Sequence, residues 1–450
     1  MAKQINRREF LKYSAMAAAV AGTGPMILRG QENAKKVNVG FIGVGGRGRA
    51  DLDECAKAGC NVVALCDVDR ESLSSAARRY PGTKTYSDYR KLFEQKDIEA
   101  VCIGTPDHHH FPASMMAITR GKHVYCEKPL THSIWEARQV AKAARDAKVA
   151  TQMGTQGSAS EGIRLLAEWI GAGAIGNVKE VHIWTDRPAG WWPQSVDRPA
   201  GEDPVPPGLN WDCWIGPAPM RPFKNGVYHG FKWRGWWDFG TCALGDIGCH
   251  AMNWPWWALK LTAPTRVEAV QSGQKKETGP AWSNIGYQFP ANGDRNAMKM
   301  FWYDGRNAQT PKDSRQWKEL LMLHELAELG DRAIDVNGQL YIGDKGKILI
   351  NGDTPRLMPE SAMREFKRPE KTIPRNKLGH HGEWLAACIG DAPARANFEY
   401  AGPLAEAVLL GNVALRLEKK IEWDSVNLKA TNAPEAAGLI KREYRKGWEV

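Results

Sequence analysis

From residue 37 onward, short apolar runs alternate with longer amphipathic segments. Five runs have the length and β-branched content of strands: VNVGFIG at 37–43, NVVALCD at 61–67, EAVCIGT at 99–105, HVYCEKP at 123–129 and VATQMG at 149–154. Continuously apolar strands separated by helix-period segments are typical of a parallel sheet whose two faces are covered by helices. The pattern therefore predicts a doubly wound, parallel α/β domain at residues 36–155.

The pattern changes after residue 155. A helical pattern near 160–172 precedes one strand, VKEVHIWTDRP at 178–188, and then a stretch rich in Pro, Gly and Trp. Three later runs alternate polar and apolar positions, as strands with one covered face do: TRVEAVQS at 265–272, SNIGYQF at 283–289 and AMKMFWY at 297–303. A second, α+β domain with an open, largely antiparallel sheet is expected at 156–450, with a surface helix at 317–329.

The composition is that of a soluble globular protein with two or three domains. The chain has 450 residues, of which 43% are hydrophobic and 25% charged, and single cores stop growing beyond about 250–300 residues. No stretch after the N-terminal segment is long and apolar enough to cross a bilayer, so no stable membrane anchor is expected. The formal net charge of +10 is dispersed along the chain, which argues against nucleic acid as a partner.

The N-terminus resembles a bacterial twin-arginine export signal. Adjacent Arg7 and Arg8 in NRREFLK precede the short, small-residue apolar run YSAMAAAVAGTG, and Ala19–Ala21 is one possible cleavage site. Such a signal is read by a translocase that carries folded proteins. We therefore expect residues 1–30 to be a signal peptide and linker, the twin-arginine translocase to be a partner, and the mature protein to be periplasmic or otherwise exported.

A glycine-rich turn follows the first predicted strand and opens a helix. Gly43, Gly45 and Gly48 have the spacing G-x-G-x-x-G. In this arrangement the first two glycines allow a tight turn and the approach of a pyrophosphate, and the third allows close packing of the helix on the strand. The turn predicts a dinucleotide site.

Asp67 ends the second predicted strand, 24 residues after the first glycine of the turn. A carboxylate at this point can accept hydrogen bonds from ribose hydroxyls. Because it would repel a 2′-phosphate, NAD is favoured over NADP as the cofactor, although the nearby Arg47 and Arg70 leave NADP open.

Two further segments follow strands and therefore lie at the carboxyl edge of the predicted sheet, where open α/β folds bind ligands. They are GTPDHHHFP at 104–112 and EKP at 127–129. Pro129 biases Lys128 toward an extended conformation, so the ammonium group can project into the crevice beside the nicotinamide. The expected cofactor-binding residues are Gly43, Gly45, Gly46, Arg47, Gly48, Asp67, Arg70, Thr105, Pro106, His108, His110, Glu127, Lys128 and Gln156.

A third candidate motif is GDIGCHAMNWPWWAL, in which Asp246 and His250 stand four residues apart. On a helix these two side chains share one face, so the carboxylate can orient the imidazole and raise its basicity. The alternative is a carboxylate–imidazole pair that only braces the start of the helix.

No metal site is expected. No third ligand accompanies Asp246 and His250 at a suggestive spacing, and the consecutive side chains of His108, His109 and His110 diverge. The nine cysteines form no C-x-x-C pair, which argues against a zinc ribbon, and their odd number argues against a disulfide framework. Cysteines in the apolar strands are expected to be buried thiols.

Taken together, these motifs resemble the Gfo/Idh/MocA family, which includes glucose–fructose oxidoreductase and inositol dehydrogenase. The resemblance runs from residue 37 to about residue 424, and it includes CDVDR at 66–70, GTP at 104–106, EKP at 127–129, GDKGKI at 343–348 and PLAEAVLLGNVALRL at 403–417. It implies a Rossmann domain joined to an α/β domain with an open sheet. It also implies that Lys128, Asp246 and His250 form the catalytic group.

The family implies an NAD-dependent oxidoreductase that acts on a secondary hydroxyl of a sugar, cyclitol or glycoside. His250 would take the hydroxyl proton, Lys128 would hydrogen-bond the same oxygen, and Asp246 would orient the imidazole. Because the space beyond the membrane offers no dependable NAD pool, we expect the cofactor to be held tightly and its redox state to be restored in each cycle. We also expect a homo-oligomer.

Two other functions stay open. One branch of the family consists of exported NAD-dependent glycoside hydrolases, which work by transient oxidation and elimination; they carry Trp-Glu-Trp-His after TP, where this chain has DHHH at 107–110. The second is an exported binding protein that has kept the fold and lost catalysis.

Fourteen of the 19 tryptophans lie between residues 169 and 302. A minority of them, among residues such as Trp191 and Trp233, are expected to form platforms for a carbohydrate.

Overall fold

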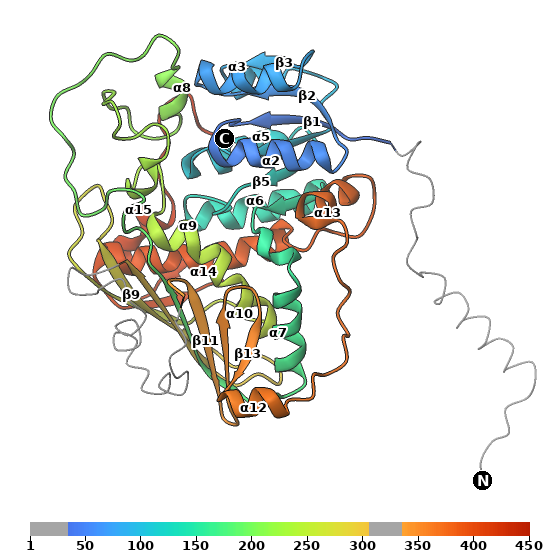
Figure 1. Ribbon diagram of the computed structural model, residues 1–450. Helices are drawn as coiled ribbons and strands as arrows, with labels where there is room; N and C mark the ends of the chain where they lie inside the picture. Colours follow the sequence, from blue (N-terminus) through green and yellow to red (C-terminus); the bar gives the residue numbers. More distant parts are fainter. Residues whose placement is uncertain (1–34, 306–334) are drawn as a thin grey trace, which may run out of the picture. The chain divides into compact units, whose positions relative to one another are not determined.

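The computed structural model describes residues 35–305 and 335–450 (Figure 1). Residues 1–36 and 37–450 are two separate units, and the elements below all belong to the second. The expected signal peptide and linker at 1–30 and the expected helix at 317–329 lie outside the described residues. Within the described ranges, no helix has the length and apolar character needed to cross a membrane.

The first sheet has six parallel strands in the order β3-β2-β1-β4-β5-β6. They are β1 (Asn38–Ile42), β2 (Asn61–Cys66), β3 (Lys84–Tyr86), β4 (Ala100–Ile103), β5 (His123–Cys126) and β6 (Thr151–Met153). This confirms the predicted parallel sheet. The apolar pattern does not predict β3, because this edge strand has three residues and two of them are exposed. The strand order reverses at β1, which opens a crevice at the carboxyl edge beside it.

Helices cover both faces of the first sheet. Those that connect its strands are α2 (Gly46–Lys57), α3 (Arg70–Arg79), α4 (Tyr89–Leu92), η2 (Asp107–His109), α5 (His110–Ile118) and α6 (Ile134–Ala147). Asp69 and Asp88 cap α3 and α4 by accepting hydrogen bonds from backbone N–H groups of the first turn. One face packs against α2, α3 and the distant α13 (Gly379–Cys388), which contributes the fully buried Trp384, and the other face packs against α5 and α6.

The second sheet has nine strands in the order β13-β12-β11-β7-β10-β9-β8-β14-β15. They are β7 (Val178–Thr185), β8 (Arg266–Gln271), β9 (Trp282–Phe289), β10 (Met298–Gly305), β11 (Gly338–Gly343), β12 (Lys347–Asn351), β13 (Pro355–Met358), β14 (Ile421–Asp424) and β15 (Lys429–Ala430). Strands β7 and β10 are parallel and the other neighbours are antiparallel. The predicted open, largely antiparallel sheet is confirmed.

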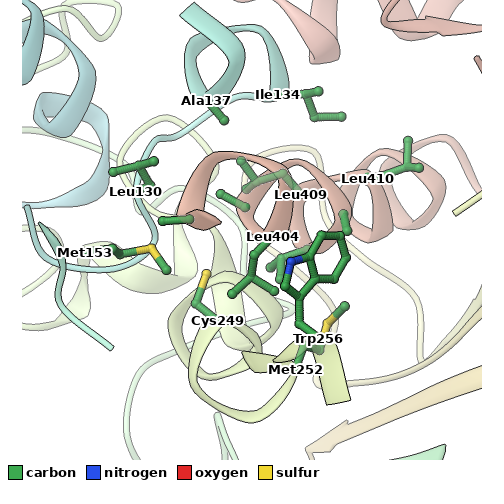
Figure 2. Packing of buried hydrophobic residues seen from close by; sticks show 14 of the residues in the cluster. Leu130, Ile134, Ala137, Met153, Cys249, Met252, Trp256, Leu404, Leu409 and Leu410 are labelled. Carbon is green, nitrogen blue, oxygen red and sulfur yellow. The ribbon is translucent and has the colours of Figure 1, made fainter. Parts of the chain in front are cut away.

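Helix α14 (Phe398–Leu417) packs against α6 on one side and against α9 and β8 on the other. Figure 2 shows Leu404 of α14 close to Cys249 and Met252, with Ala137 of α6 across the helix, and all four belong to one buried apolar cluster. At Gly402 a Cβ atom would lie 2.9 Å from the Ala141 Cβ, so the backbone of α14 packs directly against the Ala141 side chain of α6. This contact holds α9, in the second half, against the loop that follows β5.

The remaining helical segments follow β6 in the chain. They are η3 (Gln156–Ala159), α7 (Glu161–Gly171), α8 (Trp211–Ile215), η4 (Lys232–Gly235), α9 (Cys242–Ala251), α10 (Asn253–Ala258), α12 (Glu360–Glu365), η6 (Pro434–Ala436) and α15 (Ala437–Ile440). The predicted helix near 160–172 corresponds to α7.

The segment between β7 and α9, residues 186–241, crosses to the first sheet and is here called the crossing segment. Leu209 forms an antiparallel bridge with Asp69, and the Arg70 N–H donates to the Gly208 carbonyl at 2.9 Å. These contacts fasten the crossing segment to the turn after β2, at the carboxyl edge of the parallel sheet.

Candidate active site

A cavity of about 460 Å³ lies between the carboxyl edge of the first sheet and the crossing segment. The loops after β1, β2, β4 and β5 form one wall, and residues 213–234 form the other. Among the residues expected to bind the cofactor, those that line this cavity are Gly43, Gly45, Gly46, Arg47, Asp67, Thr105, Pro106, Glu127 and Lys128.

The glycine-rich turn has no room for side chains on its inner side, and its outer side faces open space. Gly43 has a φ of +79°, and a Cβ there would lie 2.8 Å from the Gly104 backbone. At Gly48 a Cβ would lie 1.9 Å from the Gly43 carbonyl oxygen, so this glycine permits the packing of α2 on β1. Gly46 begins α2 with a φ of +49° and nothing within 4 Å of its Cβ position. The cradle and the helix N-terminus fit a pyrophosphate.

Asp67 lies at the cavity wall and also braces the glycine-rich turn. Its Oδ2 accepts a hydrogen bond from the Val44 N–H at 2.8 Å, and its Oδ1 accepts one from the Asp69 N–H at 2.9 Å. Burial raises the pKa of Asp67, and the two backbone donors lower it. Since each carboxylate oxygen has two lone pairs, both oxygens keep one acceptor position for a further donor such as a ribose hydroxyl.

Arg47 links the glycine-rich turn to the EKP segment. Its Nε donates to Glu127 Oε1 at 3.1 Å, and its Nη2 donates to Asp51 Oδ1 at 2.5 Å. Gln156 Nε2 donates to the same Glu127 oxygen at 2.8 Å. Burial and the Asp51 charge raise the pKa of Glu127 to about 7, although Arg47 opposes the shift. The network holds Arg47 and Glu127 rigidly beside the cavity.

Lys128, from the loop after β5, meets α9 at the end of the cavity. Its Nζ lies 2.5 Å from Asp246 Oδ1, and Arg234 Nε donates to the same oxygen at 3.1 Å. Burial disfavours the charge on Asp246, but Lys128 and Arg234 outweigh it and hold the pKa of Asp246 well below its usual range. Two cations therefore share one buried carboxylate.

The expected pair between Asp246 and His250 is not formed. Among the described residues no hydrogen bond joins them, because Lys128 and Arg234 both bind the Asp246 carboxylate. Burial and the Lys128 charge lower the pKa of His250 to about 3, and Asp246 only partly opposes them. Asp246 does raise the basicity of the imidazole, as expected, but burial and the Lys128 charge outweigh this effect. The His250 ring is neutral at neutral pH, lies beside the ion pair and does not line the cavity.

His108 and His110, expected to bind the cofactor, do not line the cavity. Both side chains are buried, and the His108 ring nitrogens lie 3.0 and 3.2 Å from two carbonyl oxygens of the crossing segment. The His110 ring nitrogens lie 2.6 Å from the Pro129 carbonyl oxygen and 3.0 Å from that of Thr105. Since η2 begins immediately after Pro106 and α5 follows it at His110, these side chains turn into the protein and join loops together.

Three other expected cofactor residues, Gly48, Arg70 and Gln156, do not line the cavity either. Gly48 serves the contact between α2 and β1, and the side chain of Arg70 is exposed while its N–H binds the crossing segment. Gln156 Nε2 bridges Tyr125 Oη, at 2.9 Å, and Glu127.

Most residues of the second wall belong to no motif of fixed spacing, so the sequence did not predict them. The one indication in the sequence is the concentration of aromatic residues between β7 and α10, and it does not show which of these rings face the cavity. Lining residues outside the expected set include Ser72, Asp88, Tyr89, His109, Trp214, His229, Phe231, Trp233 and Arg234.

The C-terminal end of the chain supports the wall near β3. The Trp448 ring is buried, with its centroid 5.9 Å from that of Tyr89 and 5.7 Å from that of His109, and the Arg90 guanidinium lies 4.2 Å above it. Tyr89 and His109 both line the cavity. Across residues 35–305 and 335–450, no three His, Cys, Asp or Glu side chains are grouped so as to hold a metal ion.

Three segments of the chain match known families. Residues 37–155 match the oxidoreductase family, NAD-binding Rossmann fold (GFO_IDH_MocA), and residues 179–305 match the C-terminal alpha/beta domain of the same oxidoreductase family. Residues 4–24 match the TAT (twin-arginine translocation) pathway signal sequence. The fold and the glycine-lined cavity thus define an NAD-binding oxidoreductase. The chain belongs to the Gfo/Idh/MocA family and carries a signal for export by the twin-arginine route.

Curated relatives match about a third of the chain. The inositol 2-dehydrogenase/D-chiro-inositol 3-dehydrogenase of Lacticaseibacillus casei is 33% identical over 144 residues, which are 31% of this chain and 42% of that protein. A glycosyl hydrolase family 109 protein of Shewanella pealeana is 29% identical over 167 residues, 30% of this chain and 36% of that protein. The aligned part therefore spans less than half of these relatives.

A solved structure resembles nearly the whole described fold. Levoglucosan dehydrogenase in complex with NADH and levoglucosan has a TM-score of 0.56 and 19% identity, and the match covers 86% of this chain and 99% of that one. At this identity the likeness concerns the fold.

Proposed function

We propose that this protein is an exported NAD-dependent oxidoreductase that acts on a secondary hydroxyl of a sugar, cyclitol or glycoside. The observation that carries the proposal is the Lys128–Asp246 ion pair, which stands at the end of a cavity whose other parts are the glycine-rich turn and Asp67. The inositol dehydrogenase and levoglucosan dehydrogenase relatives are named for polyhydroxylated substrates, which supports this substrate class.

Each residue of the proposed catalytic group has a distinct task. NAD, when bound, supplies the hydride acceptor for oxidation of an alcohol. The Lys128 ammonium, held by Asp246, donates a hydrogen bond to the substrate oxygen and stabilises the negative charge that develops there. His250 is the proposed acceptor of the hydroxyl proton: burial and Lys128 lower its pKa to about 3, so a ring nitrogen has a free lone pair, and the ring stands next to the lining of the cavity without being part of it. Asp246 positions Lys128 and balances its charge.

The residues that would hold the cofactor are those of the glycine-rich turn and Asp67. The N–H groups at the start of α2 favour phosphate oxygens. Asp67, with one open acceptor position on each oxygen, favours the free 2′-hydroxyl of NAD and repels the 2′-phosphate of NADP.

Tight retention of NAD is part of the proposal. The crossing segment is bridged to the turn after β2, and Trp448 packs behind Tyr89 and His109, so two distant parts of the chain close the wall near Asp67. A cofactor enclosed in this way in the cytoplasm can accompany the folded protein through the twin-arginine route. The proposed periplasmic reaction then restores the redox state of the cofactor in every cycle.

A second candidate is glycoside hydrolysis by transient oxidation and elimination, because a glycosyl hydrolase family 109 protein is among the relatives. The same catalytic group would serve the oxidation. The two functions differ in their products. The hydrolase releases an aglycone, whereas the oxidoreductase yields an oxidised sugar, together with the reduced form of a second substrate where one restores the cofactor.

The experiment purifies the mature protein from the periplasm without added nucleotide, denatures it and quantifies the released dinucleotide. A panel of sugars, cyclitols and aryl glycosides is then tested for reduced nicotinamide absorbance and for released aglycone. Stoichiometric NAD with substrate-dependent reduction supports the proposal. Aglycone release without net reduction favours the hydrolase, and bound NAD with no reaction favours a binding protein. Substoichiometric NAD with turnover only on added NAD would refute cofactor retention.

A further inference from the structure

The wall of the site continues outward from the ion pair as a row of aromatic and cationic side chains. The Arg234 guanidinium, which binds Asp246, lies 4.0 Å above the Phe231 ring. The Phe231 ring centroid is 6.2 Å from that of Trp191, and the Arg187 guanidinium lies 3.4 Å above the Trp191 ring. Contacts therefore run without a gap from Lys128 and Asp246 to Arg187.

The outer members of this row are accessible. Trp191 is 48% exposed and Phe231 is 42% exposed, although both are large apolar side chains that proteins usually cover. Phe231 also lines the main cavity. The row therefore offers an accessible surface that adjoins the lining of the cavity at Phe231.

Arg187 has no strong counter-ion within the part of the chain that the structure describes. Its guanidinium donates no hydrogen bond there, and its one ion-pair contact, with Asp186, is 3.9 Å long. The Asp246 carboxylate is already shared by Lys128 and Arg234. Burial lowers the pKa of Arg187, Asp246 and Asp186 raise it, and Arg234 lowers it, so these charges lie within electrostatic reach of one another.

A guanidinium group stacked on a tryptophan face keeps its edge free for hydrogen bonds. The planar fork of arginine matches a carboxylate or a sulfate oxygen pair, with two parallel N–H···O bonds. The exposed Trp191 and Phe231 rings suit the C–H face of a sugar. A guanidinium with only one long ion-pair contact, next to such rings, is the chemistry that recognises an acidic sugar.

We propose that Arg187, Trp191 and Phe231 form a subsite for a sugar with an anionic group, so that the substrate of this enzyme is an acidic carbohydrate. The inference rests on the proposed function, because it names the substrate class of the same site. Arg187 sets specificity by pairing with the anion, and Arg234 adds positive potential between this subsite and Lys128.

The test measures binding to the mature holoprotein by titration calorimetry at low salt with D-glucuronate, D-glucose 6-sulfate and D-glucose. Glucuronate or the sulfate ester should bind at least tenfold more tightly than glucose, and the stronger of the two identifies the anion. Arg187→Gln should remove this preference while the affinity for glucose stays within twofold. Arg364→Gln, an exposed arginine on α12, is the matched control and should change nothing.

Equal affinities for the charged and neutral sugars, or no binding of either charged sugar, would overturn the subsite. An Arg187→Gln variant that loses glucose and glucuronate equally would also overturn it, because the arginine would then serve hydroxyl groups or the fold. The proposed function is tested separately, by the absorbance of the reduced cofactor. If neutral sugars reduce the cofactor and no anion preference is found, the oxidoreductase function is supported and the subsite is rejected. If binding depends on Arg187 but no sugar reduces the cofactor, the subsite is supported and the oxidoreductase function is rejected.

Discussion

Lys128 and Asp246 are 118 residues apart in the chain, and the Lys128 Nζ lies 2.5 Å from Asp246 Oδ1. The two side chains are almost fully buried, at 10% and 8% exposure. A buried charge without a partner is strongly disfavoured, so the pair holds both side chains in one orientation, and Lys128 keeps Asp246 ionised. This relationship places a positioned ammonium group at the end of the cavity and underlies the first prediction.

Replacing Lys128 by Ala should lower turnover by at least about a hundredfold, the typical value of a positioned group that acts on the reacting oxygen. Steady-state kinetics on the substrate identified by the panel provide the measurement. Lys142→Ala, which removes an exposed lysine paired with Asp146 on α6, is the control and should leave turnover unchanged. Near-normal turnover in Lys128→Ala would remove this residue from the catalytic group.

His250→Ala should also lower turnover by about a hundredfold or more, with bound NAD unchanged. In the wild-type protein, burial and Lys128 lower the pKa of His250 to about 3, so its imidazole resonances should show no titration between pH 8 and pH 5. The measurement is NMR of labelled histidine, with His250→Ala for assignment. A midpoint near 6.5 would mean that the ring is solvated and not in the environment described.

Asp67→Ala should narrow the preference for NAD over NADP, because it removes both an acceptor for ribose hydroxyls and a charge that repels a 2′-phosphate. Affinity for NAD itself should also fall, because Asp67 accepts a hydrogen bond from the Val44 N–H at 2.8 Å and so stabilises the glycine-rich turn. Dissociation constants of the two cofactors, measured on stripped protein, test this. Glu71→Ala, at an exposed position on α3, should keep the ratio, and an unchanged ratio in Asp67→Ala would exclude a ribose contact.

Trp448→Ala should speed the loss of bound NAD several-fold, because the ring packs behind Tyr89 and His109 of the cavity wall. The readout is the amount of dinucleotide that remains after dialysis of the purified protein. Trp423→Ala is a matched control, since that tryptophan is also buried but lies on β14 of the second sheet. Equal loss of NAD in both variants would indicate general destabilisation rather than a role at the wall.

His380→Gln should change how stability depends on pH. Burial lowers the pKa of His380 to about 4, whereas an unfolded histidine titrates near 6.5, so its contribution is complete above pH 6.5 and is lost as the pH falls toward 4. The difference in unfolding free energy between wild type and variant should therefore shrink by on the order of 2 kcal/mol between pH 7 and pH 4.5. Urea denaturation at both pH values measures it, and a constant difference would contradict a buried neutral ring.

The first sheet and the glycine-rich turn could be predicted because their signals are local. Five strands have continuous apolar runs, and the short β3 does not. The turn after β1 needs a glycine at position 43, because a Cβ atom there would collide with the Gly104 backbone. A steric requirement of this kind can be recognised in the sequence from the glycine itself. The placement of Lys128 at the carboxyl edge follows in the same way from its position after a strand.

The partners of the polar side chains could not be predicted. Helical spacing puts Asp246 and His250 on one face, but it says nothing of the cations that other segments bring to that carboxylate. Lys128 and Arg234 reach Asp246 only because α14 packs α9 against the parallel domain, and two positive charges bind a buried carboxylate far more strongly than a neutral ring does. His108 and His110 likewise turn inward because helical structure begins beside them.

By itself, the sequence determined the class of the fold, the dinucleotide site and the export signal, because these depend on residue periodicity and on short motifs of fixed spacing. Only the tertiary structure decided which side chains face the cavity and which charges are paired, as the crossing segment and Trp448 show. These features arise where segments far apart in the chain meet, and their energies depend on burial and on the nearest charge. The weakly paired guanidinium of Arg187 belongs to the same group, since its neighbours in the sequence do not indicate that it stacks on Trp191 and that its one ion pair among the described residues is long.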